Sequence, residues 1–480
     1  MLDHALQTVD PVGKTCVAMT QSWKMTRYWL LAAALCGAAA LEAQVPADEP
    51  ITVSTDHPRL LLRPQRLRLL KRERERTSHR WQQFEALVAG NAPMPERAFA
   101  YALYYQISGD EIFGRKAVES ALGASSDLRQ QALVYDWCQP ILTEAQSKAL
   151  AARLQKGIAD PPADSVAAVR SRVFAAVALY DHVPQLPQRE LARVVHSWWQ
   201  GKIIPTLKKG SSILSRDDAY PLLEFLHAMR DNTLIELRES YPRFFKDYAI
   251  EHLISYYPAV FSGPDTEYYI GARKGLTDPD MQLAALSRAA EFAMVAFDVN
   301  GAESQVLQGW LMHDKYVLRG PFGAPYEFLW ANPYQPGLSY YHVPLVYHNP
   351  DFGKLFVRSS WENTAQWFGF FDGAIQIFED GRLRTIDPKS VPEPLALKEA
   401  VVCFAPSSRK LRVKLDEEQA VFVLGLQPKT SYHVEIDDEE MFEAQTDIGG
   451  ILALTEIAHG KDLSVRIRDL PPASRTSNPQ

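Results

Sequence analysis

Two stretches of the chain gather side chains that transfer protons and hold carboxylates. Residues 265–274, which are expected to form an exposed loop between helices, carry Tyr269 and Arg273, and a second stretch ends in His342. Tyrosine and histidine act as general acids or bases, and an arginine can hold a carboxylate through two hydrogen bonds. These types predict Tyr269 and His342 as the catalytic proton-transfer groups and Arg273 as the group that neutralises a substrate carboxylate.

Each of these side chains also has a purely structural explanation. A tyrosine can pack at the rim of a fold, an arginine can lie on the surface, and a histidine can be satisfied by structural hydrogen bonds. His313 and Asp314 share a helix end, where capping explains them as well as catalysis does. No spacing of cysteine and histidine suggests a zinc site, so the sequence predicts neither a metal nor a cofactor.

Aromatic and acidic side chains extend the candidate site to the binding of sugar. Tyrosine and tryptophan rings suit the apolar faces of sugars, although packing at a domain interface explains them equally well. Arg216, Asp217 and Asp218 lie at a helix start, where all three can line a cleft; Asp217 and Asp218 can instead cap the helix. The residues predicted to bind substrate are Tyr268, Trp310, Trp330, Tyr334, Tyr341 and Asp218, with Tyr326 as a further stacking ring.

The first two thirds of the chain show helical periodicity. Pro64 suits a first helical turn, Thr143 and Gln146 match a capping box, and Asp164 can cap the helix that follows it. Short links between consecutive helices predict antiparallel hairpins that close into a toroid or stack as a solenoid, and no fixed repeat favours the solenoid. Further helices are predicted at 96–107, 111–122, 186–200, 218–230, 235–247 and 280–298.

From about residue 338 the pattern changes to a period of two. Asp372-Gly373 and Asp380-Gly381 are typical hairpin turns, and many short strands predict a β-sandwich. Residues 320–348 are dense in Tyr, Trp, Pro and Gly and predict an irregular, aromatic-lined connection. The expected strands are 355–359, 365–371, 374–378, 399–404, 410–414, 420–424, 431–436, 451–456 and 463–468.

The predicted organisation has four parts. Residues 1–43 read as a signal peptide, with a basic start, an apolar run and a small residue before the cleavage point, and the true start can be Met25. Residues 44–337 are the helical domain, 338–470 the β domain, and 471–480 a disordered tail. The protein is therefore expected in the periplasm or outside the cell, with no membrane span after cleavage; the alternatives are a retained anchor or a lipid attached at Cys36.

Composition limits the partners. The formal net charge is -7, which gives no global signal for nucleic acid. The arginine-rich run at residues 63–80 can bind a polyanion, but interleaved leucines favour the solvated outer face of an amphipathic helix. Cys138 and Cys403 remain after signal cleavage, and the sequence favours two buried free thiols over a disulfide.

Several motifs together resemble the heparinase II/III-like polysaccharide lyases. They are His57-Pro58-Arg59-Leu60-Leu61-Leu62, Gly109-Asp110-Glu111, Ala132-Leu133-Val134-Tyr135-Asp136-Trp137 and Val357-Arg358-Ser359-Ser360-Trp361. The resemblance implies an incomplete (α/α) toroid followed by an antiparallel β-sandwich. It also implies cleavage of an acidic, uronic-acid-containing polysaccharide or oligosaccharide by β-elimination, and it places a catalytic tyrosine in the stretch that holds Tyr269.

The sequence also departs from that family. The stretch that begins Ser215-Arg216-Asp217-Asp218 lacks the usual Asn-His pair, and no histidine occurs between His348 and His433. Two alternatives therefore remain open beside the lyase. One is a non-catalytic glycan-binding protein on the same fold. The other is a toroidal glycoside hydrolase, which needs two opposed carboxylates such as Asp218 and Glu267.

Overall fold

The computed structural model describes residues 50–470, apart from 125, 212, 263–266, 276–279, 315–317, 388–392, 406–408, 416–418, 439 and 455–461. The predicted signal peptide at 1–43 and the predicted tail at 471–480 lie outside the described residues. Contacts divide the chain into residues 1–43 and residues 44–480, so the helices and the strands described below belong to one compact unit. Within the described part, no helix combines the length and the apolar character needed to cross a membrane.

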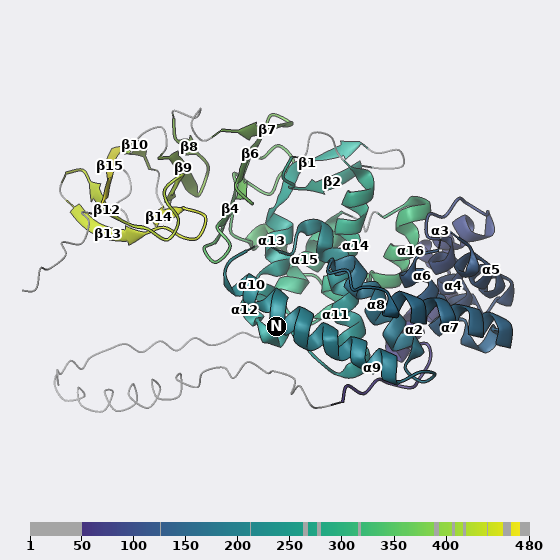
Figure 1. Ribbon diagram of the computed structural model, residues 1–480. Helices are drawn as coiled ribbons and strands as arrows, with labels where there is room; N and C mark the ends of the chain where they lie inside the picture. Colours follow the sequence, from purple (N-terminus) through teal and green to yellow (C-terminus); the bar gives the residue numbers. More distant parts are fainter. Residues whose placement is uncertain are drawn as a thin grey trace, which may run out of the picture. The chain divides into compact units, whose positions relative to one another are not determined.

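The N-terminal part of the described chain is helical (Figure 1). Pro64 occupies the first turn of α2, and the Thr143–Gln146 capping box that begins α7 is formed, as predicted. The helices are α2 (Pro64–Glu75), α3 (His79–Ala89), α4 (Arg97–Ser108), α5 (Glu111–Leu122), α6 (Leu128–Trp137), α7 (Glu144–Ala159), α8 (Val166–Leu179), α9 (Gln185–Ala192), α10 (Ile204–Lys208), α11 (Ala219–Thr233), α12 (Pro242–Lys246), α13 (Tyr248–Ile254), α14 (Met281–Phe297), α15 (Ala302–His313) and α16 (Gly320–Trp330). Shorter helical turns are η1 (Gln139–Ile141), η3 (Arg216–Asp218), η4 (Leu237–Ser240) and η5 (Tyr340–His342), and η2 (Arg193–Ile203) is a π-helix.

The most buried helices contact one another in a cyclic order. Helix α4 packs against α6, α6 against α8, α8 against α11, α11 against α14 and α14 against α16, and α16 returns to α3 and α4. Helix α6 is buried along its whole length, as expected for an inner helix. A toroid requires such a cyclic order of neighbours, but the order alone does not establish the toroid, which stays a prediction.

Four local expectations differ from the structure. Residues 267–271 form strand β2 (Glu267–Gly271), paired with β1 (Tyr256–Ser262), where the sequence suggested a loop. The connection at 320–348 begins with helix α16, which tolerates Pro325 in its interior. The single helix predicted at 235–247 is broken into η4 and α12, because Pro242 cannot continue a preceding helix. Ser165, rather than Asp164, caps α8.

The C-terminal part of the described chain contains three sheets (Figure 1). Asp372 and Gly373, like Asp380 and Gly381, have positive φ, as two-residue hairpin turns require. The first sheet has the order β3 (Val346–Asn349), β4 (Lys354–Arg358), β5 (Trp367–Phe371), β6 (Ala374–Glu379), β7 (Arg382–Ile386). The second has the order β14 (Leu452–Leu454), β11 (Ala420–Leu424), β9 (Ala400–Phe404), β8 (Leu395–Ala396), and the third β10 (Lys410–Lys414), β15 (Asp462–Asp469), β12 (Ser431–Ile436), β13 (Glu440–Gln445).

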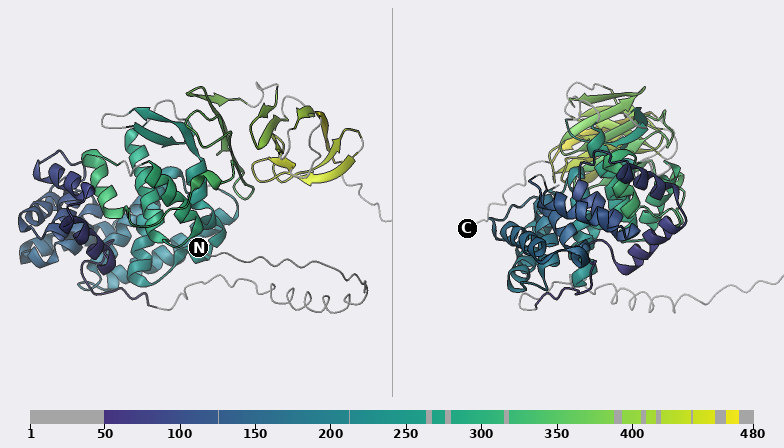
Figure 2. Two further views of the ribbon diagram at one scale, coloured as in Figure 1. Left: turned by 180° about the vertical axis from the view of Figure 1, so that it is seen from behind. Right: turned by 90° about the vertical axis from the view of Figure 1, so that its right-hand side faces the viewer.

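The three sheets are stacked in layers, because alternate side chains along a strand belong to different hydrophobic cores. In β9, Val402 and Phe404 join the core shared with the first sheet, whereas Val401 and Cys403 join the core shared with the third. In β4, Leu355 faces the second sheet and the adjacent Phe356 joins the helical core. Successive side chains of a strand point to opposite faces, so each of the first two sheets is covered on both sides. The green and yellow strands in Figure 2 follow this layering.

The expected antiparallel sandwich is therefore only partly right. The first and third sheets are antiparallel, but β9 and β11 in the second sheet pair in parallel, and the described residues of the C-terminal part form three sheets where a sandwich has two. Cys138 lies in the helical core and Cys403 in the core between the second and third sheets. Both are free and buried, which settles the disulfide question in favour of two thiols.

Candidate functional site

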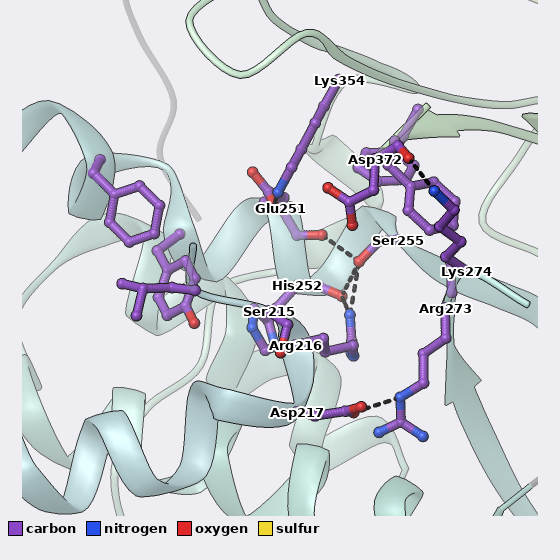
Figure 3. A pocket seen from close by; sticks show the side chains of 16 residues that line it. Ser215, Arg216, Asp217, Glu251, His252, Ser255, Arg273, Lys274, Lys354 and Asp372 are labelled. Atoms are coloured by element: carbon purple, nitrogen blue, oxygen red, sulfur yellow. Dashed lines mark hydrogen bonds and ion pairs between the residues drawn. The ribbon is translucent and has the colours of Figure 1, made fainter. Parts of the chain in front are cut away.

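A charged cavity of about 230 Å³ lies where the helices meet the first sheet (Figure 3). Its wall combines η3, α13, the residues that follow β2, strand β4 and the β5–β6 turn. The cationic side chains in this wall are Arg216, Arg273, Lys274 and Lys354, and the acidic ones are Asp217, Glu251 and Asp372. Such a wall suits a polar, negatively charged ligand better than an apolar one.

Arg216 is held rigidly at the base of this site. Its Nε donates to Ser287 Oγ at 2.7 Å, Nη1 donates to Ser255 Oγ at 2.7 Å, and Nη2 donates to Glu291 Oε1 at 3.1 Å. The guanidinium also lies 4.4 Å from the centre of the Tyr256 ring. Because these contacts come from α13, α14 and β1, they tie the three elements together around one buried charge.

Gly271 leaves the space that Arg216 occupies. A Cβ atom at this position would lie under 3.0 Å from Nε, Cζ and Nη2 of Arg216. Gly271 does not have a positive φ, so the requirement for glycine here is the close approach of the guanidinium and not a left-handed backbone.

Tyr248 and His252 lie one helical turn apart on α13, and both line the cavity. Their ring centres are 4.9 Å apart, and His252 Nδ1 is 3.7 Å from Oε1 of the buried Glu291. The Tyr248 hydroxyl is buried without a hydrogen-bond partner among the described residues. A histidine beside a buried carboxylate is the arrangement that orients an imidazole for proton transfer.

The electrostatics suit a neutral histidine and a protonated tyrosine. Burial, followed by the charge of Arg216, lowers the pKa of His252, so the ring is uncharged near neutral pH. Burial, followed by Glu251, raises the pKa of Tyr248. Burial acts to raise the pKa of Glu291, but His252 and then Arg288 and Arg216 outweigh it, and this carboxylate stays ionised.

Arg273 is the predicted catalytic residue that lines the cavity. Its Nε pairs with Asp217 Oδ1 at 2.7 Å, and Nη2 donates to the Leu283 carbonyl at 3.1 Å. Its Nη1 is buried with no hydrogen-bond partner among the described residues. Burial lowers its pKa, which Asp217 partly opposes. An unsatisfied guanidinium nitrogen at a cavity wall is the group that a bound oxyanion or an ordered water would satisfy.

The remaining charges of the wall are partly paired (Figure 3). Lys354 Nζ lies 2.6 Å from Glu251 Oε1, and Lys274 Nζ donates to the backbone carbonyl of Asp372 at 2.9 Å. The hydrogen bond of Lys274 is therefore made to a neutral carbonyl group and not to a carboxylate.

Tyr269 and His342, the predicted proton-transfer pair, are not in this cavity. Tyr269 donates to Asn363 Oδ1 at 2.7 Å and packs against the Trp310 ring at 5.5 Å. His342 is exposed at the end of η5. Of the three predicted catalytic residues, only Arg273 lines the cavity, so the expected convergence of all three in one cleft is not seen there.

The predicted sugar-stacking rings differ in exposure. Trp310 and Trp330 are 5% and 2% exposed, and Trp330 is covered by Arg66 and donates to the Tyr220 hydroxyl, so both rings serve packing. Tyr326 is 3% exposed and donates to Glu96. Half-exposed rings remain at Tyr334 and Tyr341, which are 56% and 50% exposed, and Tyr268 is partly buried in β2.

Of the acidic residues that the sequence singled out, Asp217 lines the cavity, whereas Asp218, Glu267 and Asp314 lie outside its wall. Asp218 accepts hydrogen bonds from the Ser215 backbone and hydroxyl, so it caps η3, which is the structural alternative that the sequence left open. Glu267 is exposed at the start of β2. Asp314 pairs with Arg288 at 2.5 Å, while His313 packs edge-on against Tyr340.

Sequence reasoning missed Tyr248, His252 and Glu291. The Tyr248/His252 pair has a signal in the sequence, the i, i+4 spacing that puts two side chains on one helix face. It went unseen because the helix predicted at 235–247 stopped before Tyr248, and no helix was predicted over α13. Glu291 gives no signal, because it lies inside an apolar helix and meets His252 only in the fold. Among the described residues, no group of three or more His, Cys, Asp or Glu is placed to hold a metal ion.

Comparison with known proteins does not assign a family. No family model matches the chain, and no curated protein matches it. The chain is similar to a solved structure described as a glycoside hydrolase, at 10% identity and a TM-score of 0.30 over 78% of this chain and 71% of that one. It is also similar to a GH127 beta-arabinofuranosidase, at 10% identity and a TM-score of 0.27 over 88% and 81%. At such TM-scores the likeness carries no argument about fold or function. Neither description names a lyase, and the heparinase II/III-like resemblance remains a prediction from the sequence.

Proposed function

We propose that the charged cavity binds a carboxylate-bearing sugar and that the protein is an exported, carbohydrate-active enzyme on a toroid-like helical body. One observation carries this proposal: Arg273, Tyr248 and His252 line the same cavity, and neither Arg273 Nη1 nor the Tyr248 hydroxyl has a hydrogen-bond partner among the described residues. An arginine, a neutral histidine and a protonated tyrosine are the groups that elimination next to a carboxylate requires.

The proposed reaction is β-elimination from a uronic-acid residue, whose linkage is taken from the family resemblance. Arg273 neutralises the substrate carboxylate and so acidifies the adjacent C–H. His252 takes that proton, and the buried Glu291 stabilises the imidazolium that forms. The C–H electron pair becomes the new C=C bond, the glycosidic C–O bond breaks, and Tyr248 gives its proton to the leaving oxygen. Tyr248 then recovers a proton from solvent and His252 releases one, so the protons balance.

Hydrolysis of a glycosidic bond is the second candidate. Asp217, Glu251 and Asp372 line the same cavity, and a glycoside hydrolase needs two carboxylic groups, one as acid and one as base or nucleophile. Asp217 and Glu251 are already engaged in ion pairs with Arg273 and Lys354, so neither carboxyl is left free for a sugar linkage without breaking such a pair. We therefore rank hydrolysis below elimination.

Two simultaneous assays of the full chain separate these reactions on a panel of uronate-containing polymers. Elimination produces both new reducing ends and the ultraviolet absorbance of an unsaturated uronate, whereas hydrolysis produces reducing ends alone. Neither signal on any uronate polymer, from protein that is folded by circular dichroism, would refute the proposed enzyme.

Matched substitutions test the residues. Tyr248→Phe and His252→Gln should each lower kcat by about 100-fold or more, in line with lost acid–base catalysis. The controls Tyr269→Phe and His342→Gln change the same residue types outside the cavity and should stay within about threefold of wild type, which is about 0.65 kcal/mol. If the loss instead follows Tyr269 and His342, the site predicted from sequence is correct and the cavity is not the active site.

A further inference from the structure

A second pocket, of about 520 Å³, lies between α2, α11 and α16 and shares no lining residue with the charged cavity. Five arginines line it: Arg63, Arg66, Arg68, Arg72 and Arg230. Asp231 is the acidic side chain in its wall. The pocket therefore concentrates positive charge in a protein whose formal net charge is -7.

The single carboxylate is already occupied. Asp231 Oδ1 lies 3.0 Å from Arg63 Nη1 and 3.1 Å from Arg230 Nε. Arg68 and Arg72 are exposed on α2 and form no ion pair with any residue in the described part of the chain. Their positive charges are therefore not neutralised by the protein itself.

Arg66 forms the floor of this pocket. Its guanidinium lies 4.3 Å from the centre of the buried Trp330 ring, and Nη1 donates to the Leu329 carbonyl at 3.2 Å. These contacts fix the group without neutralising it. Burial lowers the pKa of Arg66 to about 10, with further lowering from Arg230 and Arg63 that Asp231 opposes. A bound anion would relieve this desolvation and repulsion.

The spacing on α2 explains how one helix supplies the cluster. Residues 65 and 69, like residues 68 and 72, are four positions apart, so each pair lies on one face of α2, and all four residues line the pocket. Lys71 and Arg74 are exposed on the same helix but do not line this pocket. The arginines of the 63–80 run are thus divided between a concave site and a solvated face, where the sequence favoured the solvated face alone.

We propose that this pocket is a second binding site for an acidic oligosaccharide, in which Arg66, Arg68 and Arg72 hold its carboxylate or sulfate groups. The volume exceeds that needed by one small anion and falls within the range typical of organic ligands. Guanidinium groups bind both oxyanions bidentately, so the shared chemistry is a sugar-borne oxyanion. The choice of an acidic sugar as the ligand rests on the proposed function. The presence of a positively charged pocket rests only on the residues that line it. The site would hold a polymer away from the cavity while its reacting unit occupies the cavity.

Equilibrium binding to the full chain tests this site without requiring turnover. Titration calorimetry at low salt would use two probes, an oligogalacturonate for carboxylate and a heparin oligosaccharide for sulfate. The host protein carries Arg273→Ala, which disables the cavity and keeps failure of the proposed reaction separate from failure of this site. Arg68→Ser/Arg72→Ser should weaken binding of at least one probe about tenfold or more, since charge-assisted contacts are lost.

The control Lys71→Ser/Arg74→Ser removes the same charge from the same helix outside the pocket. It should change the dissociation constant by less than about twofold, as expected of exposed charges screened by solvent. Equal weakening by both pairs, or none by Arg68→Ser/Arg72→Ser, would overturn the proposal. So would binding of inorganic sulfate as tight as that of the sulfated oligosaccharide, because the site would then be a small-anion site.

Discussion

Substituting Gly271 with alanine tests whether the base of the cavity is built as described. The new Cβ would lie under 3.0 Å from three atoms of Arg216, whose guanidinium is fixed by Ser255, Ser287 and Glu291. Overpacking costs about 1–3 kcal/mol, and losing one charge-assisted hydrogen bond costs about 1.5–3 kcal/mol. We therefore expect Gly271→Ala to lower the free energy of unfolding by about 2.5–6 kcal/mol, the sum of the two costs.

Urea unfolding of the purified chain, followed by fluorescence, measures this loss. Gly157→Ala is a matched control, because its Cβ would meet Leu128 Cδ1 at 2.6 Å, the far end of a flexible side chain that can turn away. Alanine is also favoured over glycine inside α7 by about 1 kcal/mol, so the control should be close to neutral.

A double-mutant cycle identifies the cause. In an Arg216→Ala background the clashing atoms are absent, so Gly271→Ala should cost less than about 1 kcal/mol, consistent with strong coupling of contacting residues. An equal loss of stability in both backgrounds would refute the reasoning, because the penalty would then come from the backbone of β2. A loss no larger than that of Gly157→Ala would refute it as well.

Three further outcomes are expected. Arg273→Lys keeps the charge but loses the planar guanidinium, whose Nε pairs with Asp217 and whose Nη1 has no partner among the described residues, so the KM for an acidic substrate should rise about tenfold or more; an unchanged KM would show that a point charge suffices. Burial lowers the pKa of His227 to about 4, below its unfolded value of about 6.5. The unfolded chain binds more protons between these values, so about 3 kcal/mol of stability present above pH 6.5 is lost by pH 4, and urea titrations of His227→Gln should show a smaller loss. Burial raises the pKa of both thiols, to about 12 for Cys403, so neither Cys138 nor Cys403 should react with a thiol reagent in the native state; rapid native labelling of either would contradict their burial.

Much of the fold follows from local patterns. Alternation over residues 410–414, 420–424 and 431–436 predicted strands whose bounds match β10, β11 and β12. The parallel pairing of β9 with β11 was missed, because alternation fixes the faces of a strand and not its neighbour. The β1–β2 hairpin was also missed. The link between its strands includes residues outside the described part of the chain, and its tyrosines were interpreted as catalytic and substrate-binding residues, not as residues of a strand.

The sequence also predicted some residues of the candidate site and missed others. Arg216, Asp217 and Arg273 were singled out as types that suit a cleft, and they do line one cavity. Tyr269 was chosen from family resemblance and a tyrosine-rich motif. Every second side chain of a strand lies on the same face, so Tyr269 and Arg273 would share a face only if the strand continued as far as Arg273. Strand β2 ends at Gly271, so Arg273 lies beyond it. The partner of His252 is Glu291, 39 positions away, and such a contact is set by helix packing that periodicity does not specify.

The most direct test of the central claim compares a short uronate oligosaccharide with its carboxyl-reduced, neutral counterpart by titration calorimetry. The protein would carry Arg68→Ser/Arg72→Ser, so that the arginine-lined pocket does not contribute. We predict that the acidic sugar binds at least about tenfold more tightly than the neutral one, and that Arg273→Gln abolishes this preference. Equal affinity for the two sugars, or a preference that survives Arg273→Gln, would contradict a cavity built to hold a carboxylate.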